Sequence, residues 1–298
     1  MEHVNISTAT LREGYSTHSV TSKDGTTIRY RQLGHGPGVV MLHGSMESAQ
    51  SHMRLAEALG DAFTVYLPDR RGHMLGVPLA ENYSMGKEVD DLDALLTETG
   101  SHNVFGVSSG GLIALRAALT LPAVRKAALY EPALLLSSPS PALLKRLDDE
   151  IVQGKTAAAL VTGMKGAQMG PPLFNAMPRW LLERLTNTAI AQEDEQAKQG
   201  DVTMRMLAPT LHYDFQLVNE MAQTLESFRA VRIQVLLLGG SKSQAFLKDA
   251  LDALEQVLPH VRRVEFPGLD HGGSSDPSPT NHHGNPGLVA QELRRYFA

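Results

Sequence analysis

The sequence has 298 residues, of which 42% are hydrophobic and 20% charged, and it contains no cysteine. This composition is typical of a globular chain that forms one large domain, or one core domain with an inserted subdomain. The formal net charge of -5 gives no reason to expect nucleic acid or an anionic membrane as a partner. The lack of cysteine excludes disulfides, cysteine-based zinc sites and a cysteine nucleophile.

The first residues, Met1 to Ser7, carry neither a basic region nor an apolar run, so we expect no signal peptide. The longest apolar stretches, such as Val235 to Leu238, are far too short to span a bilayer. We therefore expect a soluble cytoplasmic protein without membrane contact, and the sequence leaves a homodimer open.

Short apolar runs typical of strands alternate with longer helical runs along the chain. An early hairpin is predicted where Lys23-Asp24-Gly25 separates Ser19–Ser22 from Thr27–Arg31. Further strands are predicted at Gly38–Leu42, Phe63–Leu67, Asn103–Val107, Lys126–Tyr130, Ile233–Leu238 and Val261–Phe266. Helices are predicted at Ser48–Leu59, Met85–Thr97, Gly110–Leu121, Ala245–Leu258 and Leu288–Phe297. This alternation predicts an α/β fold with a largely parallel sheet, helices on both faces and antiparallel first strands.

The alternation breaks between Ser137 and Arg229, where the sequence contains no convincing strand. Helical runs take its place at Ala142–Val152, Thr156–Met164, Trp180–Ala191 and Leu217–Leu225. We interpret residues 137–229 as a helical cap inserted into a core made of residues 1–136 and 230–298. A second irregular stretch, Gly272–Gly287, is a loop by its composition.

A nucleophile is predicted in the segment Gly106-Val107-Ser108-Ser109-Gly110, which fits the pattern G-x-S-x-G between a predicted strand and a predicted helix. A sharp turn of this kind holds one side chain clear of the backbone, and the small residues on either side permit the bend. The helix that follows points its N-terminus at the site and favours developing negative charge. Only Ser108 is in register, because a frame centred on Ser109 puts Val107 where glycine is needed. The alternative is a plain glycine-rich turn.

Nearly the whole chain resembles the α/β-hydrolase family. The family's motifs are matched in order by Val39-Val40-Met41-Leu42-His43-Gly44-Ser45, by Asp69-Arg70-Arg71-Gly72-His73, by the turn at Ser108, and by Pro267-Gly268-Leu269-Asp270-His271. Their joint occurrence is specific for the fold and much less specific for the substrate. The resemblance implies an α/β-hydrolase fold, with a mostly parallel eight-stranded sheet and an inserted helical cap.

The resemblance also implies the partners of the nucleophile. His271 follows the last predicted strand, where the family delivers the histidine that takes the proton of the serine hydroxyl. The usual acid position after the preceding strand holds Gly239-Gly240-Ser241, without a carboxylate until Asp249. A subset of the family, including some lactone hydrolases, carries the acid one strand after the nucleophile, and Glu131 occupies that place here. Asp270 is a weaker rival, and an ordinary strand-end ion pair is the alternative role for Glu131.

The oxyanion of a tetrahedral intermediate needs two fixed N–H donors. We expect them from Ser109, directly after the nucleophile, and from Ser45, with Met46 as the fallback for the second. Further substrate contacts are predicted at His43, Met46, Trp180 and His212, although His43 and His212 also suit purely structural or surface roles.

These residues predict a cofactor-independent serine hydrolase that cleaves a carboxylic ester or lactone of a hydrophobic small molecule through an acyl-enzyme. Acyl transfer or cleavage of a carbon–carbon bond by the same residues is an alternative, and so is a non-catalytic member of the fold that binds a ligand. No cofactor is expected. A metal site at His271, His282 and His283 lacks supporting ligand spacing.

Overall fold

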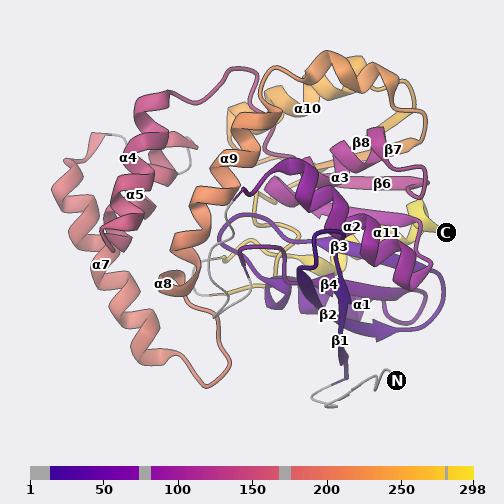
Figure 1. The fold of residues 1–298 in the computed structure, drawn as a ribbon, viewed down its shortest axis with the longest axis horizontal. Helices are drawn as coiled ribbons and strands as arrows, with labels where there is room; N and C mark the ends of the chain where they lie inside the picture. The colour runs from indigo at the N-terminus through magenta and orange to yellow at the C-terminus, as the bar shows by residue number, and fades with distance from the viewer. Residues whose placement is uncertain (1–13, 74–81, 168–175, 279–280) are drawn as a thin grey trace.

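The structure, a computed structural model, describes residues 14–73, 82–167, 176–278 and 281–298 (Figure 1). The expectation about a signal peptide falls on residues outside these ranges. Within them, none of the helices combines the length and the apolar character needed to cross a membrane.

A single eight-stranded sheet forms the centre of the fold, in the order β1-β2-β4-β3-β5-β6-β7-β8 (Figure 1). Its strands are β1 (Ser16–Thr21), β2 (Thr27–Gly34), β3 (Gly38–Leu42), β4 (Thr64–Pro68), β5 (Asn103–Val107), β6 (Lys126–Tyr130), β7 (Gln234–Gly240) and β8 (Val261–Phe266). The first two strands form the predicted antiparallel hairpin, and β2 also runs antiparallel to β4. All later pairings are parallel. The prediction of a mostly parallel sheet with an antiparallel beginning is therefore confirmed.

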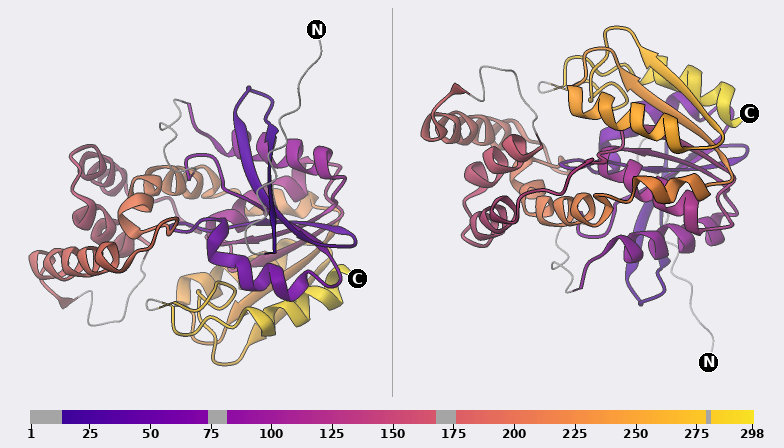
Figure 2. Two further views of the ribbon diagram at one scale, coloured as in Figure 1. Left: turned by 90° about the horizontal axis from the view of Figure 1, so that it is seen from below. Right: turned by 90° about the horizontal axis from the view of Figure 1, so that it is seen from above.

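Helices cover both faces of this sheet, as Figure 2 shows from two sides. They are α1 (Met53–Leu59), α2 (Met85–Thr99), α3 (Ser108–Thr120), α10 (Ala245–Val257) and α11 (Pro286–Phe297). One buried apolar cluster joins the sheet to α2, α3 and α10, and a second joins its other face to α1 and α11. The central strands β3, β5, β6 and β7 are therefore buried on both sides, as their nearly unbroken apolar sequences predict.

Helices replace strands between β6 and β7, where the described residues form no strand. They are α4 (Pro141–Val152), α5 (Thr156–Gly166), α7 (Arg179–Gln196), α8 (Met204–Leu207) and α9 (Leu211–Met221), and they lie beside the sheet (Figure 1). A third apolar cluster, separate from those of the sheet, packs these helices together. The exact division of the chain at residues 137 and 229 stays a prediction.

Several predicted helices differ in their bounds from those observed, and two differ in how they begin. The run from Ser48 to Leu59 begins with a 3-10 turn, because the Ser48 hydroxyl accepts from Gln50 N and closes a tighter first turn before α1. Helix α9 begins six residues before the predicted Leu217 and ends at Met221, after which Gln223 has a left-handed backbone with φ 63°.

Candidate active site

The nucleophile turn joins β5 to α3 at the carboxyl edge of the sheet. Ser108 has φ 53°, a left-handed conformation that costs energy for a residue with a side chain. The chain can bend this sharply because both neighbours two residues away are glycines. A Cβ on Gly106 would lie 2.4 Å from the Gly110 carbonyl oxygen, and one on Gly110 would lie 2.4 Å from the His43 carbonyl oxygen. The turn holds the partly exposed Ser108 at the N-terminus of α3.

The predicted base and acid are hydrogen-bonded to each other. His271, in the loop after β8, has its Nδ1 2.8 Å from Oε2 of Glu131, directly after β6. Glu131 is fully buried, and its Oε1 accepts from Gly240 N at 2.7 Å. The carboxylate is thus fixed between the ends of β6 and β7, and its contact with Nδ1 leaves His271 Nε2 as the free ring nitrogen.

Strand pairing places Ser108 next to this pair. Val107 of β5 pairs with Tyr130 of β6, so Ser108 and Glu131 follow paired residues on neighbouring strands. Ser108 O also accepts from Ala133 N at 3.2 Å. The hydrogen bonds of the described residues do not include one between the Ser108 hydroxyl and His271, and such bonds commonly form only when substrate binds.

The rival acids lie elsewhere. Asp270 Oδ2 is 2.8 Å from His283 Nδ1, and its Oδ1 accepts from Gly272 N. Asp249 is exposed on α10. The strand that precedes the usual acid position ends at Gly240, where a Cβ would lie 2.3 Å from the Leu269 carbonyl oxygen. The loop that carries His271 therefore packs where another side chain would stand.

The loop after β3 lies against the nucleophile turn. A Cβ on Gly44 would lie 3.0 Å from Ser108 Cβ, so the backbone that leads into Ser45 touches the nucleophile. Met46 in this loop has φ 57° and packs against the apolar cluster of the inserted helices. The assignment of the Ser45 and Ser109 N–H groups as oxyanion donors stays a prediction.

Of the four predicted substrate contacts, His43 is buried and hydrogen-bonded to the main chain. It is 1% exposed, its Nδ1 is 2.9 Å from Gly44 O, and its Nε2 accepts from Arg70 N at 3.1 Å. Burial, together with His73 and Arg70, holds its pKa well below the ordinary value, so the ring is neutral. Both ring nitrogens are occupied by the main chain, and we therefore do not retain His43 as a substrate contact.

The two predicted contacts in the inserted helices lie at the surface. Trp180 is 66% exposed at the start of α7. His212 on α9 has its Nδ1 2.7 Å from Asp148 Oδ1, and both side chains are partly exposed. A role for either in substrate binding stays a prediction.

A second charged cluster, which no sequence motif predicted, connects the loop after β3 to the loop that carries His271. Glu47 Oε2 accepts from Gly44 N at 2.7 Å and lies 3.0 Å from His52 Nε2, and Glu47 Oε1 accepts from the Ser275 hydroxyl at 2.5 Å. Burial opposes ionisation of Glu47, but His52 and these hydrogen bonds lower its pKa to about 2. Burial likewise opposes the charge on His52, yet Glu47 raises its pKa. The two residues form a partly buried ion pair.

The long loop after His271 is held in place by further hydrogen bonds. Asp276 N donates to Ser51 O at 2.8 Å, and the Asp276 carboxylate accepts from Arg54 N. Inside the loop, Asn281 Nδ2 donates to Gly272 O at 2.9 Å. The position of His271 thus depends on contacts with the start of α1. Among the described residues, no group of three or more potential ligands is arranged to hold a metal ion.

A strained serine between a strand and a helix, followed one strand later by a buried glutamate that binds a late histidine, is the arrangement of an α/β-hydrolase. The sequence matches the alpha/beta hydrolase family over residues 39–283, and the chain belongs to this family. Among its relatives is the "uncharacterized hydrolase YraK" of Bacillus subtilis (strain 168), 27% identical over 262 residues that cover 84% of this chain and 87% of that protein.

Two further similarities cover most of the chain. A "cis-3-alkyl-4-alkyloxetan-2-one decarboxylase" of Shewanella oneidensis is 25% identical over 276 residues, 84% of this chain and 81% of its own. A solved structure of an alpha/beta hydrolase from Sphaerobacter thermophilus DSM 20745 superimposes with a TM-score of 0.75 at 26% identity, over 94% of this chain and 100% of that one.

Proposed function

We propose that this chain is a cofactor-independent serine hydrolase that cleaves a carboxylic ester or a lactone of a hydrophobic small molecule. The observation that carries the proposal is the 2.8 Å contact between His271 Nδ1 and the buried Glu131, beside the strand that ends at Val107, directly before Ser108. This contact leaves His271 Nε2 to take the proton of the Ser108 hydroxyl, and a carboxylate at Nδ1 stabilises the resulting imidazolium.

The reaction follows from these positions. Ser108 Oγ bonds to the ester carbonyl carbon while its proton passes to His271, and the carbonyl oxygen becomes an oxyanion held by the N–H groups of Ser45 and Ser109. The carbon–oxygen bond to the alcohol then breaks, and the alcohol takes the proton from His271. Water repeats the sequence on the acyl-enzyme and releases the acid. With a lactone, both products are one hydroxy acid.

The relatives and the packing support the choice of substrate. The oxetan-2-one in the name of the Shewanella relative is a cyclic ester. Met46, next to Ser45, packs against an apolar cluster that includes Leu160, Leu211 and Phe215 of the inserted helices. An apolar wall of this kind next to the reaction centre favours a hydrophobic acyl or alcohol group.

Labelling with a fluorophosphonate probe tests the mechanism, because the probe captures an activated serine. Wild type is expected to label stoichiometrically and Ser108→Ala not at all; equal labelling of both proteins would contradict the mechanism. The matched control is Ser137→Ala, a serine on the segment after β6, which is expected to label like wild type.

A panel of nitrophenyl esters and lactones, including an oxetan-2-one, tests the reaction. Steady multiple turnover to the free acid is expected. Three outcomes would each contradict the proposal: transfer of the acyl group to an added alcohol in preference to water, release of carbon dioxide from the oxetan-2-one, or tight retention of ligand without turnover.

A further inference from the structure

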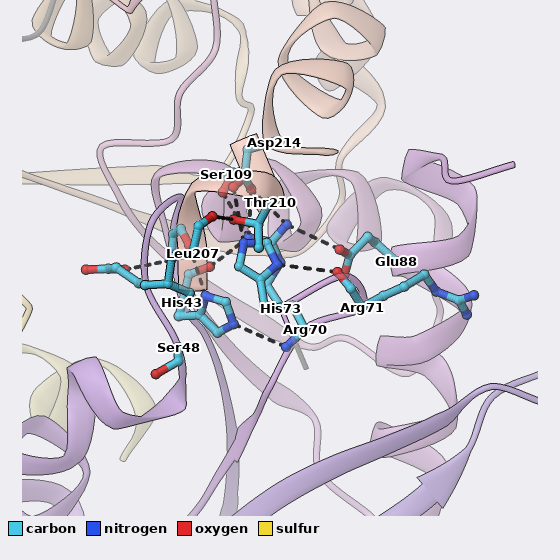
Figure 3. A network of polar contacts seen from close by, with 12 residues as sticks. His43, Ser48, Arg70, Arg71, His73, Glu88, Ser109, Leu207, Thr210 and Asp214 are labelled. Atoms are coloured by element: carbon cyan, nitrogen blue, oxygen red, sulfur yellow. Dashed lines mark hydrogen bonds and ion pairs between the residues drawn. The ribbon is translucent and has the colours of Figure 1, made fainter. Parts of the chain in front are cut away.

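A buried polar network reaches from the inserted helices to the residue after the nucleophile (Figure 3). Its outer member is Asp214 on α9, which is 1% exposed. Asp214 Oδ1 accepts from Arg70 Nη1 and from Arg70 Nη2, both at 3.2 Å, and Asp214 Oδ2 lies 3.2 Å from His73 Nε2. A carboxylate from the inserted helices is therefore part of the core, at the turn after β4.

Arg70 carries this contact to the nucleophile turn. Its Nη1 donates to the Ser109 hydroxyl at 2.9 Å and to the His43 carbonyl oxygen at 3.1 Å, and its Nη2 donates to Glu88 Oε1 at 3.2 Å. The Ser109 hydroxyl also contributes to the lowered pKa of Asp214. Ser109 is thus held by Arg70, which is itself paired with Asp214.

The charges of this pair persist inside the protein. Burial opposes the charge on Arg70, but Glu88 and Asp214 raise its pKa above the ordinary value. Burial would likewise neutralise Asp214, but His73 and Arg70 hold its pKa below the ordinary value. A buried ion pair with these hydrogen bonds has a fixed geometry, and removal of the Asp214 charge leaves Arg70 with Glu88 as its remaining charged partner.

We propose that Asp214 is a positioning residue for the reaction: through Arg70 and the Ser109 hydroxyl it fixes the Ser109 peptide unit, whose N–H is an oxyanion donor. This inference rests on the function proposed above. An oxyanion donor is effective only when its direction is fixed before charge develops. Tying Ser109 to α9 makes that direction depend on the inserted helices being in place.

The test compares Asp214→Asn with wild type and with Asp194→Asn. Asp194 also pairs with an arginine within the inserted helices, but at the surface. Active sites are titrated with the fluorophosphonate probe, so that kcat refers to folded, labelled protein. Asp214→Asn is expected to lower kcat per titrated site by about tenfold with KM changed less than about twofold, since a misdirected donor weakens the transition state more than substrate binding. Asp194→Asn is expected to match wild type.

A double-mutant cycle and hydrogen exchange complete the experiment. Ser109→Ala keeps the N–H but removes the hydroxyl through which Asp214 is proposed to act. The double variant Ser109→Ala/Asp214→Asn is therefore expected to have a kcat less than about twofold below that of Ser109→Ala alone. Asp214→Glu, which keeps the charge, is expected to recover part of the kcat. Amide exchange in the peptide that spans residues 105–115 is expected to be faster in Asp214→Asn than in wild type and to be unchanged in Asp194→Asn.

The outcomes separate this inference from the proposed function. An unchanged kcat per titrated site in Asp214→Asn, together with unchanged exchange in residues 105–115, would overturn the positioning role. The positioning role would also be overturned if the fold-losses in kcat of Asp214→Asn and Ser109→Ala simply multiplied in the double variant. If wild type neither labels nor turns over esters, the proposed function fails, while the exchange measurement still decides whether Asp214 holds the turn.

Discussion

His271 receives its carboxylate partner from the end of β6, because Glu131 Oε2 lies 2.8 Å from His271 Nδ1 while the end of β7 carries only glycines. The backbone N–H of Gly240 then binds the other oxygen of Glu131 at 2.7 Å. Of the two neighbouring strands, β6 therefore supplies the carboxylate and β7 fixes its orientation.

Glu131→Gln tests this arrangement. The amide keeps the shape but cannot stabilise the imidazolium and favours the wrong tautomer, so we expect kcat to fall by about 10³- to 10⁴-fold. Asp249→Asn, at the rival position exposed on α10, is expected to retain wild-type activity on the same nitrophenyl ester. Full activity of Glu131→Gln would reject Glu131 as the acid.

The ion pair of Glu47 and His52 predicts a pH-dependent stability. The raised pKa of folded His52 means that its contribution is complete below the ordinary value of 6.5 and is lost as pH rises through the folded value. The lowered pKa of Glu47 means that its contribution is complete above 4.5 and is lost as pH falls towards about 2. The pair therefore stabilises the fold most between pH 4.5 and 6.5.

His52→Gln provides the measurement. Urea denaturation is expected to show a loss of about 2 kcal/mol in the free energy of unfolding near pH 5.5, and a smaller loss near pH 9. His282→Gln, an exposed histidine in the loop after His271, is the control and is expected to show neither. A loss in the free energy of unfolding of His52→Gln that grows with rising pH would contradict the predicted pH dependence of the ion pair.

Gly240→Ala tests the close packing at the end of β7. The added Cβ would lie 2.3 Å from Leu269 O and 2.7 Å from Asp270 N, directly before His271, so the backbone of this loop must move. We expect a loss of about 3 kcal/mol in the free energy of unfolding and a lower kcat per folded molecule. Gly86→Ala in α2, where the nearest atom is 3.7 Å from the new Cβ, is expected to cost nothing.

Removal of metal ions tests whether the proposed hydrolysis depends on a metal. Exhaustive treatment with EDTA is expected to leave ester hydrolysis unchanged, because the proposed mechanism needs only a serine, an imidazole, a carboxylate and backbone N–H groups. Activity that collapses and returns on addition of a divalent cation would contradict the mechanism.

Much of the fold could be predicted from the sequence, because local signals and burial agree there. The bounds of β5 and β6 coincide with the predicted ones, since each is a short apolar run followed by residues unsuited to continue a strand, Ser108-Ser109-Gly110 and Glu131-Pro132. The neighbourhood of Glu131 and His271 was expected from the resemblance to the α/β-hydrolase family, and it agrees with the rule that the carboxyl ends of parallel strands share one edge of the sheet.

The polar networks could not be predicted, because their members lie far apart in the sequence. Arg70 and Asp214 are separated by 144 positions, and Ser275 and Glu47 by 228. A local signal was Asp214 itself, a charge between the buried Tyr213 and Phe215 of α9. A carboxylate on the apolar face of a helix indicates a buried partner but does not identify it.

Helix α9 belongs to two hydrophobic interiors at once. Its Tyr213 and Leu217 pack into the sheet's cluster with α2 and α3, while Leu211 and Phe215 pack among the inserted helices. If either cluster unfolds, the other loses the packing contacts that α9 supplies to it. Heating is therefore expected to give a single calorimetric transition, with the inserted helices and the sheet lost together.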